Sequence, residues 1–365
     1  MSKHPYKSLP EHCFWRESIA APLPADVDPV VRAKFSIAPT DKVATAGSCF
    51  AQHIARRLQR EGFHYFVPEA AHPLFPPARA EEFGFGVFSA RYGNIYTSRQ
   101  LVQLFQRAYG LFTPREQYWL RPDNRVIDPF RPQIQPNGFS CMEEFEADRQ
   151  QHFVAVRRMV EELDVFVFTL GLTEGWVSSE DGAAYPLCPG VAGGTFDSDK
   201  YRFINLGAGE VISNVNWAIE FLRSRNPKAR VILTVSPVPL AATAMDRSVL
   251  VSTTYSKSVL RVAAEENSRE RDYVAYFPSY EIIVGAFNRG VYFAQDLRSV
   301  TEAGVGHVMR LFMKHYAARP TQEKPEIPAP QDREAELELQ SRRQAAEIEE
   351  AAKVICDEEM LASRI

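Results

Sequence analysis

The chain lacks any long apolar run. No stretch approaches the roughly 18 apolar residues of a membrane-spanning helix, and the amino terminus has no apolar core of a signal peptide. The five cysteines are scattered without a C-x-x-C pair, which indicates reduced thiols more than a disulfide framework. Clusters of Lys and Arg are absent as well, so the sequence carries no electrostatic footprint for nucleic acid. These absences predict a cytoplasmic protein with no membrane span and no nucleic-acid partner.

The composition is that of an ordinary globular protein. The 365 residues suffice for one large or two ordinary domains, and 45% of them are hydrophobic against 24% charged. The formal net charge of −4 is concentrated in residues 331–365, where acidic residues outnumber basic ones ten to five. The rest of the chain is therefore close to neutral, and its charge says nothing about a substrate.

Apolar segments of strand and helix type alternate along the chain. Residues 42–46 form a short apolar run, residues 50–58 are apolar at helical spacing, and residues 63–67 resume as a strand, which together predict a βαβ unit. Further strands are expected at 164–170, 230–235 and 273–278. Further helices are expected after residue 101, from the Ser140 and Glu143 capping box through residue 163, and near 213–225, 256–271 and 300–318. This alternation predicts a doubly wound α/β sheet.

The chain changes character after residue 318. Four prolines fall between residues 320 and 330, and the charged stretch that follows has apolar residues at spacings of three and four. We therefore expect an amino-terminal segment (1–34), one α/β domain (35–318), a linker (319–331) and a solitary amphipathic helix (332–365). That helix is a candidate handle for a protein partner or for self-association.

Ligands of open α/β sheets bind beyond the carboxyl ends of the strands, where Ser48 follows the first predicted strand. Gly47 permits a sharp bend, and the first N–H groups of the next helix are available to an oxyanion. Ser48 is thus a candidate nucleophile, although the local pattern alone favours a helix N-cap, for which serine is a preferred residue. Cys49 is either a thiol nucleophile or, more simply, a small buried hydrophobe.

The run at 45–51, Thr-Ala-Gly-Ser-Cys-Phe-Ala, contains the signature of the GSCFA domain family, which resembles a branch of the SGNH/GDSL hydrolases. The resemblance extends over about residues 35–318. It includes Arg-Tyr-Gly-Asn-Ile-Tyr-Thr at 91–97, Gly-Leu-Thr-Glu at 171–174, Ser-Pro-Val-Pro at 236–239 and Asp-Leu-Arg at 296–298. It implies a three-layer α/β/α, flavodoxin-like fold with a parallel sheet. The implied activity is hydrolysis or transfer of an ester acyl group, often on carbohydrate.

The resemblance also implies roles for individual residues. Ser48 matches the nucleophile, and Gly93 with Asn94 corresponds to the second oxyanion block. In the third block of SGNH enzymes an asparagine donates to the oxyanion, whereas this chain has Thr173 and Glu174. Thr173 can still donate a hydrogen bond, but a carboxylate at position 174 only accepts.

The last block departs further from the SGNH pattern. Those enzymes carry Asp-x-x-His with histidine as the base, and this chain has Asp296 followed by Ser299. Ser299 with Glu302 is also explained as a helix capping box. His307 is the histidine closest in sequence to Asp296, so it is the candidate base, although a histidine on a helix is more often a satisfied structural residue.

Other chemistry is poorly represented. No dinucleotide or phosphate-binding loop is complete, and no spacing of His, Cys or Asp indicates a metal, so neither a cofactor nor a metal is expected. Trp176, Tyr185, Tyr201 and Trp217 form either a sugar-stacking wall or ordinary core.

The sequence thus favours a serine esterase or acyltransferase with Ser48, Asp296 and His307 in catalytic roles, acting on a small-molecule or glycan ester. The alternative is a ligand- or glycan-binding module that kept the fold and lost the base.

Overall fold

The computed structural model describes residues 4–317 together with Asp357 and Met360. The predicted linker (319–331) and, apart from those two residues, the predicted terminal helix (332–365) lie outside the described residues.

A four-stranded parallel sheet forms the centre of the molecule, with strand order β1-β4-β8-β9. The strands are β1 (Val43–Gly47), β4 (Val165–Leu170), β8 (Arg230–Val235) and β9 (Val274–Tyr276). A parallel bridge between Val43 and Tyr65 continues the sheet beyond β1. Nearly every residue of these strands is buried, because helices cover both faces and leave no solvated side for polar residues.

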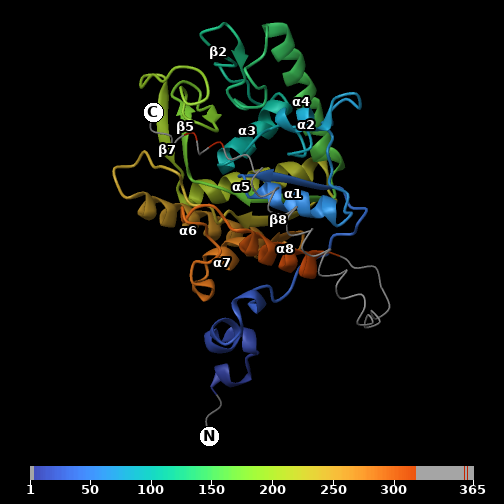
Figure 1. Cartoon of the computed structure of the whole chain (residues 1–365), viewed down its shortest axis with the longest axis vertical. Coiled ribbons are helices and arrows are strands. Elements are labelled where there is room, and N and C mark those ends of the chain that lie inside the picture. Colours follow the sequence, from blue (N-terminus) through green and yellow to red (C-terminus); the bar gives the residue numbers. More distant parts are fainter. Residues whose placement is uncertain (1–3, 318–356, 358–359, 361–365) are drawn as a thin grey trace.

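Helices pack on both faces of the sheet and complete three layers (Figure 1). One face carries α3 (Ser98–Ala108), α4 (Met142–Glu162), α5 (Ala208–Arg225) and α6 (Val249–Ser268). The other face carries α1 (Ala51–Arg60), α7 (Ser279–Val284) and α8 (Glu302–Tyr316). Strand side chains alternate between the layers: Phe166 and Phe168 pack in the first, Val165 and Val167 in the second. The expected three-layer α/β/α fold is confirmed.

Some predicted elements have different bounds. The strand expected at 63–67 is reduced to the bridge at Tyr65. Helix α5 begins at residue 208 rather than near 213, and α6 begins at residue 249 rather than near 256. The N-cap of α6 is Ser248, whose side chain accepts a hydrogen bond from the N–H of Leu250.

The region between β4 and α5, which had no assigned structure, contains a three-stranded antiparallel sheet in the order β6-β5-β7. Its strands are β5 (Glu174–Ser178), β6 (Ala184–Tyr185) and β7 (Tyr201–Asn205). Two further elements were not anticipated between α1 and α4: helix α2 (Pro77–Glu82) and the hairpin of β2 (Trp119–Leu120) with β3 (Val126–Ile127). These additions lie on the α3 and α4 side of the molecule in Figure 1.

Part of the amino-terminal segment is attached to α8. His315 and Lys314 both contact the Asp28 carboxylate at 2.7 Å, and the N–H of Ile37 donates to the carbonyl of Tyr316. Four short helical turns, η1 (Pro5–Ser8), η2 (Glu11–Cys13), η3 (Arg16–Ala20) and η4 (Pro24–Asp26), precede this contact. A fifth, η5 (Ala286–Asn288), follows α7.

Candidate functional site

Three turns meet at the carboxyl end of β1. The N–H of Ile95 donates to the carbonyl of Gly47 (2.8 Å), and the N–H of Leu172 donates to the carbonyl of Tyr96 (2.8 Å). Gly171 lies so close to the first turn that a Cβ there would be 3.1 Å from the Ser48 Cβ. The segments after β1 and β4 and the loop at 93–96 therefore surround Ser48.

Gly47 is required by this arrangement. Its φ of +134° is a conformation that L-residues rarely adopt, and a Cβ there would lie 2.2 Å from the carbonyl oxygen of Thr169. The absence of a side chain lets β1 end directly against β4, so that the next residue, Ser48, turns over the sheet edge.

Ser48 is buried, with 4% of its surface exposed, and its Oγ has no hydrogen-bond partner among the described residues. The N-cap of α1 is Phe50, without a side-chain cap, so the helix-cap interpretation of Ser48 is wrong. The neighbouring Cys49 is buried, and the four described cysteines form no disulfide. Burial of a hydroxyl without a hydrogen-bond partner costs free energy. Such exceptions are typical of positions that contact a ligand or take part in catalysis.

Asn94 lines a cavity of about 150 Å³. Its Oδ1 accepts from Gln52 Nε2 (3.4 Å), and its Nδ2 donates to a carboxylate oxygen of Asp357 (3.0 Å). Gly93, whose φ is +69°, lines the same cavity. Asp357 is 6% exposed, and burial raises the pKa of its carboxyl group to about 6 although the bond from Asn94 opposes the shift. A carboxyl group from the end of the chain is thus held by the amide of the predicted second oxyanion block.

Lys257 reaches the same strand end from α6. Its side chain is almost fully buried (1% exposed), and Nζ donates to the carbonyl of Gly171 at 2.8 Å. One residue earlier, Ser256 Oγ accepts from the N–H of Thr173 (3.0 Å). Helix α6 therefore holds the turn after β4 and brings a buried amine beside the residues that contact Ser48.

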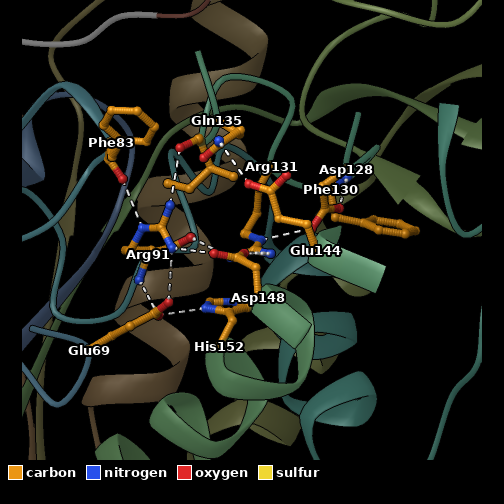
Figure 2. A network of polar contacts seen from close by, with 11 residues as sticks. Glu69, Phe83, Arg91, Asp128, Phe130, Arg131, Gln135, Glu144, Asp148 and His152 are labelled. Carbon is orange, nitrogen blue, oxygen red and sulfur yellow. Dashed lines mark hydrogen bonds and ion pairs between the residues drawn. The ribbon is translucent and has the colours of Figure 1, made fainter. Parts of the chain in front are cut away.

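A buried network of charged residues holds the loop that carries Asn94 (Figure 2). Asp148 on α4 accepts from Arg91 (2.6 Å) and from Arg131 (2.8 Å), and Arg131 also donates to Asp128 (2.8 Å). The backbone N–H of Arg91 donates to Glu69 (2.7 Å). Further bonds fix the Arg91 guanidinium on two carbonyls, those of Phe83 and Ile134. The loop starting at residue 91 is therefore fixed by α4 and the 128–134 segment.

The protonation states in this network follow from its geometry. Burial and the charge of Arg131 lower the pKa of His152, so its imidazole is neutral and Nδ1 donates to Glu69 (2.8 Å). Burial alone would raise the pKa values of Asp128 and Asp148, but Arg131 first and other guanidinium groups next outweigh it and hold both below their usual range.

The residues of the third block make other bonds. Thr173 donates its hydroxyl proton to Asn205 Oδ1 (2.7 Å), so this proton is already used in a bond within the protein. Glu174 accepts from Thr243 Oγ1 at 2.8 and 2.9 Å. Trp176 packs edge-on against Phe196 and Phe203.

The remaining members of the expected aromatic wall also pack inside the protein. Tyr185 and Tyr201 are buried and donate to Glu116, and Trp217 stacks on Phe221. Tyr185 and Tyr201 therefore occupy core positions, whereas Trp176 and Trp217 are partly buried and pack against the core.

Asp296 caps a turn. Its carboxylate accepts from the Ser299 hydroxyl (2.5 Å) and from the N–H groups of Ser299 and Arg298 (2.9 and 3.0 Å), and the Ser299 hydroxyl is the main cause of its lowered pKa. The N-cap of α8 is Thr301, so the expected capping box from Ser299 to Glu302 is wrong.

His307 lies within the α8 layer. Its Nε2 donates to the carbonyl of Val27 (2.9 Å), and its Nδ1 accepts from the Tyr292 hydroxyl (2.8 Å). Both ring nitrogens are thereby used, and neither bonds to Ser48 or Asp296. His307 lies eleven positions after Asp296, and the helix directs the imidazole into its own apolar layer.

Sequence reasoning missed Lys257, Asp357 and the acidic partners of Arg91. The lysine left a detectable signal, because it occupies the apolar face of α6 at helical spacing from Leu260 and Ala264. The contact of Asn94 with Asp357 spans 263 residues and left no local signal.

Among the described residues, no helix is long and apolar enough to cross a membrane, and no group of three or more His, Cys, Asp and Glu side chains is arranged to hold a metal. The family model described as the GSCFA family matches residues 42–312. This span contains β1 through most of α8 and all three turns around Ser48. No curated protein matches the chain.

Proposed function

The chain belongs to the GSCFA family, and from that premise we propose that it is a serine-dependent esterase or acyltransferase whose nucleophile is Ser48. The proposed substrate is an acylated carbohydrate or a similar small hydroxyl compound. The expectation of a cytoplasmic location accompanies this proposal, because the few cysteines are scattered and none of the four described ones forms a disulfide.

The observation that carries the proposal is the state of the Ser48 hydroxyl. It is buried and lacks a described hydrogen-bond partner, although the helix beside it would accept a capping serine. Asn94 supplies an amide donor in the adjoining loop. A nucleophile next to a donor for the developing oxyanion is the minimum that acyl transfer requires.

The donor is already directed toward an acidic oxygen. Asn94 Nδ2 donates to the Asp357 carboxylate, which has the chemistry of the acid that ester hydrolysis releases. This contact supports a role for Asn94 in binding the acyl oxygen, and Gly93 lines the same cavity. Asp357 must leave Asn94 before an ester binds there.

In place of a histidine, we propose Lys257 as the base that accepts the proton of Ser48. An amine accepts a proton in its neutral form, and Lys257 Nζ is a buried amine that donates to the carbonyl of Gly171, beside the turn that contacts Ser48. Ser48 Oγ then attacks the acyl carbon while its proton moves to Nζ. The bond to the alcohol breaks, the alcohol leaves with the proton, and water or a second hydroxyl attacks the acyl group and returns a proton to Ser48.

The remaining candidate is a ligand-binding module without turnover. The position of His307, bonded at both ring nitrogens, and the Asp296–Ser299 turn favour it, since neither provides the expected base. The two functions differ in the reactivity of Ser48, because an unactivated serine does not react rapidly with electrophiles.

Labelling with an aryl fluorophosphonate tests the proposal, with the site identified by mass spectrometry. Wild-type protein should be labelled at Ser48, Ser48→Ala should not be, and hydrolysis of short-chain aryl esters should disappear with the label. Lys257→Met should lower the labelling rate by a factor of about 100 or more, within the range ascribed to general base catalysis. The matched control is Lys228→Met, at an exposed lysine.

A pH profile separates catalysis from a structural effect of Lys257. Above about pH 6, where the contact of Asp357 no longer changes, the labelling rate of the wild type should rise with pH if Lys257 is the base, and that rise should be absent in Lys257→Met. Folded protein that is neither labelled nor active on any ester would contradict the proposal and leave the binding module.

A further inference from the structure

A second cavity lies away from Ser48, between the carboxyl end of α3 and helix α4. Its volume is about 560 Å³, within the range of sites for small ligands. Arg107, Arg149 and Arg157 line it, and the lining contains no Asp or Glu. Aromatic walls are provided by Phe112, Phe130, Phe153 and Tyr109.

The three guanidinium groups have no carboxylate partner among the described residues. Arg107 lies over the Phe130 ring (3.9 Å), and its Nε is buried without a hydrogen bond. Arg149 lies over the Phe145 ring (4.7 Å), and Arg157 donates to the carbonyl of Ala108 (2.5 Å). Rings and a neutral carbonyl are therefore the contacts of these three charges.

The nearby acids are occupied elsewhere. Asp128 attracts Arg107 electrostatically but accepts its hydrogen bonds from Arg131 and Phe130, and Asp148 is bonded to Arg91 and Arg131. Helix α4 thus supplies an acid to the ion network on one side and unpaired arginines to the cavity on the other. Burial and the charges of Arg131 and Arg149, only partly offset by Asp128, lower the pKa of Arg107 to about 10, consistent with an excess of positive charge.

We propose that this cavity binds a small organic anion, a ring that carries a phosphate or carboxylate group. Guanidinium groups match both anions in geometry and charge, and the aromatic walls provide a surface for the ring. The three like charges around one cavity repel one another, and a bound anion reduces that repulsion. The site is separate from the proposed chemistry at Ser48, although Phe130 also lines the Asn94 cavity.

Isothermal titration calorimetry on the full chain tests the site with phenyl phosphate, benzoate, inorganic phosphate and phenol. We expect phenyl phosphate to bind more tightly than inorganic phosphate, because the ring adds contacts, and phenol not to bind. The comparison with benzoate distinguishes a phosphate site from a carboxylate site. Affinity should fall when sodium chloride is raised from about 50 mM to about 300 mM.

Arg149→Gln should weaken phenyl phosphate binding about tenfold or more, the loss expected for one charge-assisted hydrogen bond. The matched control is Arg158→Gln on the same helix, because Arg158 is 54% exposed and pairs with Glu162 at 2.9 Å. It should bind like the wild type. Absence of binding to every anion at millimolar concentration, or equal affinities of Arg149→Gln and the wild type, would overturn the proposal.

Discussion

Asp148→Asn is the sharpest test of the ion network below the Asn94 loop. The carboxylate joins two guanidinium groups that are almost fully buried, those of Arg91 and Arg131. Asparagine keeps the shape of the side chain but removes its charge, and its NH₂ group faces a guanidinium N–H with no acceptor between them. Loss of one partner from a buried pair typically costs about 3–5 kcal/mol.

We therefore expect the free energy of unfolding to fall by about 3 kcal/mol, near the lower limit, because Asp148 is partly accessible and each arginine retains another acid. Urea titration followed by tryptophan fluorescence measures this change. The control is Glu266→Gln, which removes an ion pair of similar length (2.9 Å) between exposed side chains and should cost less than about 1 kcal/mol.

The network also predicts a pH dependence. Because the pKa of Asp148 is lowered in the folded protein, its contribution to stability is present above the unfolded pKa near 3.8 and is lost as the pH falls below it. Asp148→Asn should flatten the stability curve in that acidic range. The assignment is refuted if the free energy of unfolding of the variant lies within about 1 kcal/mol of the wild-type value and depends on acidic pH in the same way. In that case the Asp148 carboxylate does not hold the loop.

Three other changes have clear expected results. Gly47→Ala should lower the free energy of unfolding by about 3 kcal/mol or more, because φ is positive and the new Cβ would lie 2.2 Å from the Thr169 carbonyl oxygen. Urea titration measures this change, and a wild-type stability would contradict the close packing of β1 on β4. Burial lowers the pKa of His53 from 6.5 to about 4, so stability should fall as the pH drops through that interval, and His53→Gln should remove this part of the dependence. The raised pKa of Asp357 means that its contact with Asn94 weakens as the pH rises from about 3.8 to about 6. Ser48 labelling should therefore increase more steeply over that range in the wild type than in Asp357→Asn, and an identical profile in both would rule out occlusion by this residue.

The central layers of the fold were predictable because their signals are local. Continuous apolar runs at 164–170 and 230–235 indicated buried parallel strands, and helical periodicity located α3, α4 and α8. The three-stranded sheet after β4 escaped prediction because its short strands are interrupted by turns. Its pairing joins residue 174 to residue 205, which no local pattern reveals.

The site was predictable at the strand ends and not beyond them. The position of Ser48 follows from the rule that parallel sheets bind ligands at their carboxyl edge, and Asn94 comes from a motif. Thr173 illustrates the limit, since its donor capacity was evident while its partner, Asn205, depends on how β7 pairs with β5. His307 shows the same limit, because proximity in sequence to Asp296 did not determine where α8 directs the imidazole.

The contact between Asn94 and Asp357 has a consequence for synthesis of the chain. The two residues are 263 positions apart, so at about 5–20 residues per second translation of the second follows the first by roughly 13–53 s. The turns around Ser48 are complete only once residue 174 has been added, and Asp357 lies 183 positions beyond that point, so the Asn94 cavity lacks its carboxyl occupant while those residues are synthesised. Asn94 is therefore accessible to ligands in the growing chain before Asp357 occupies its amide.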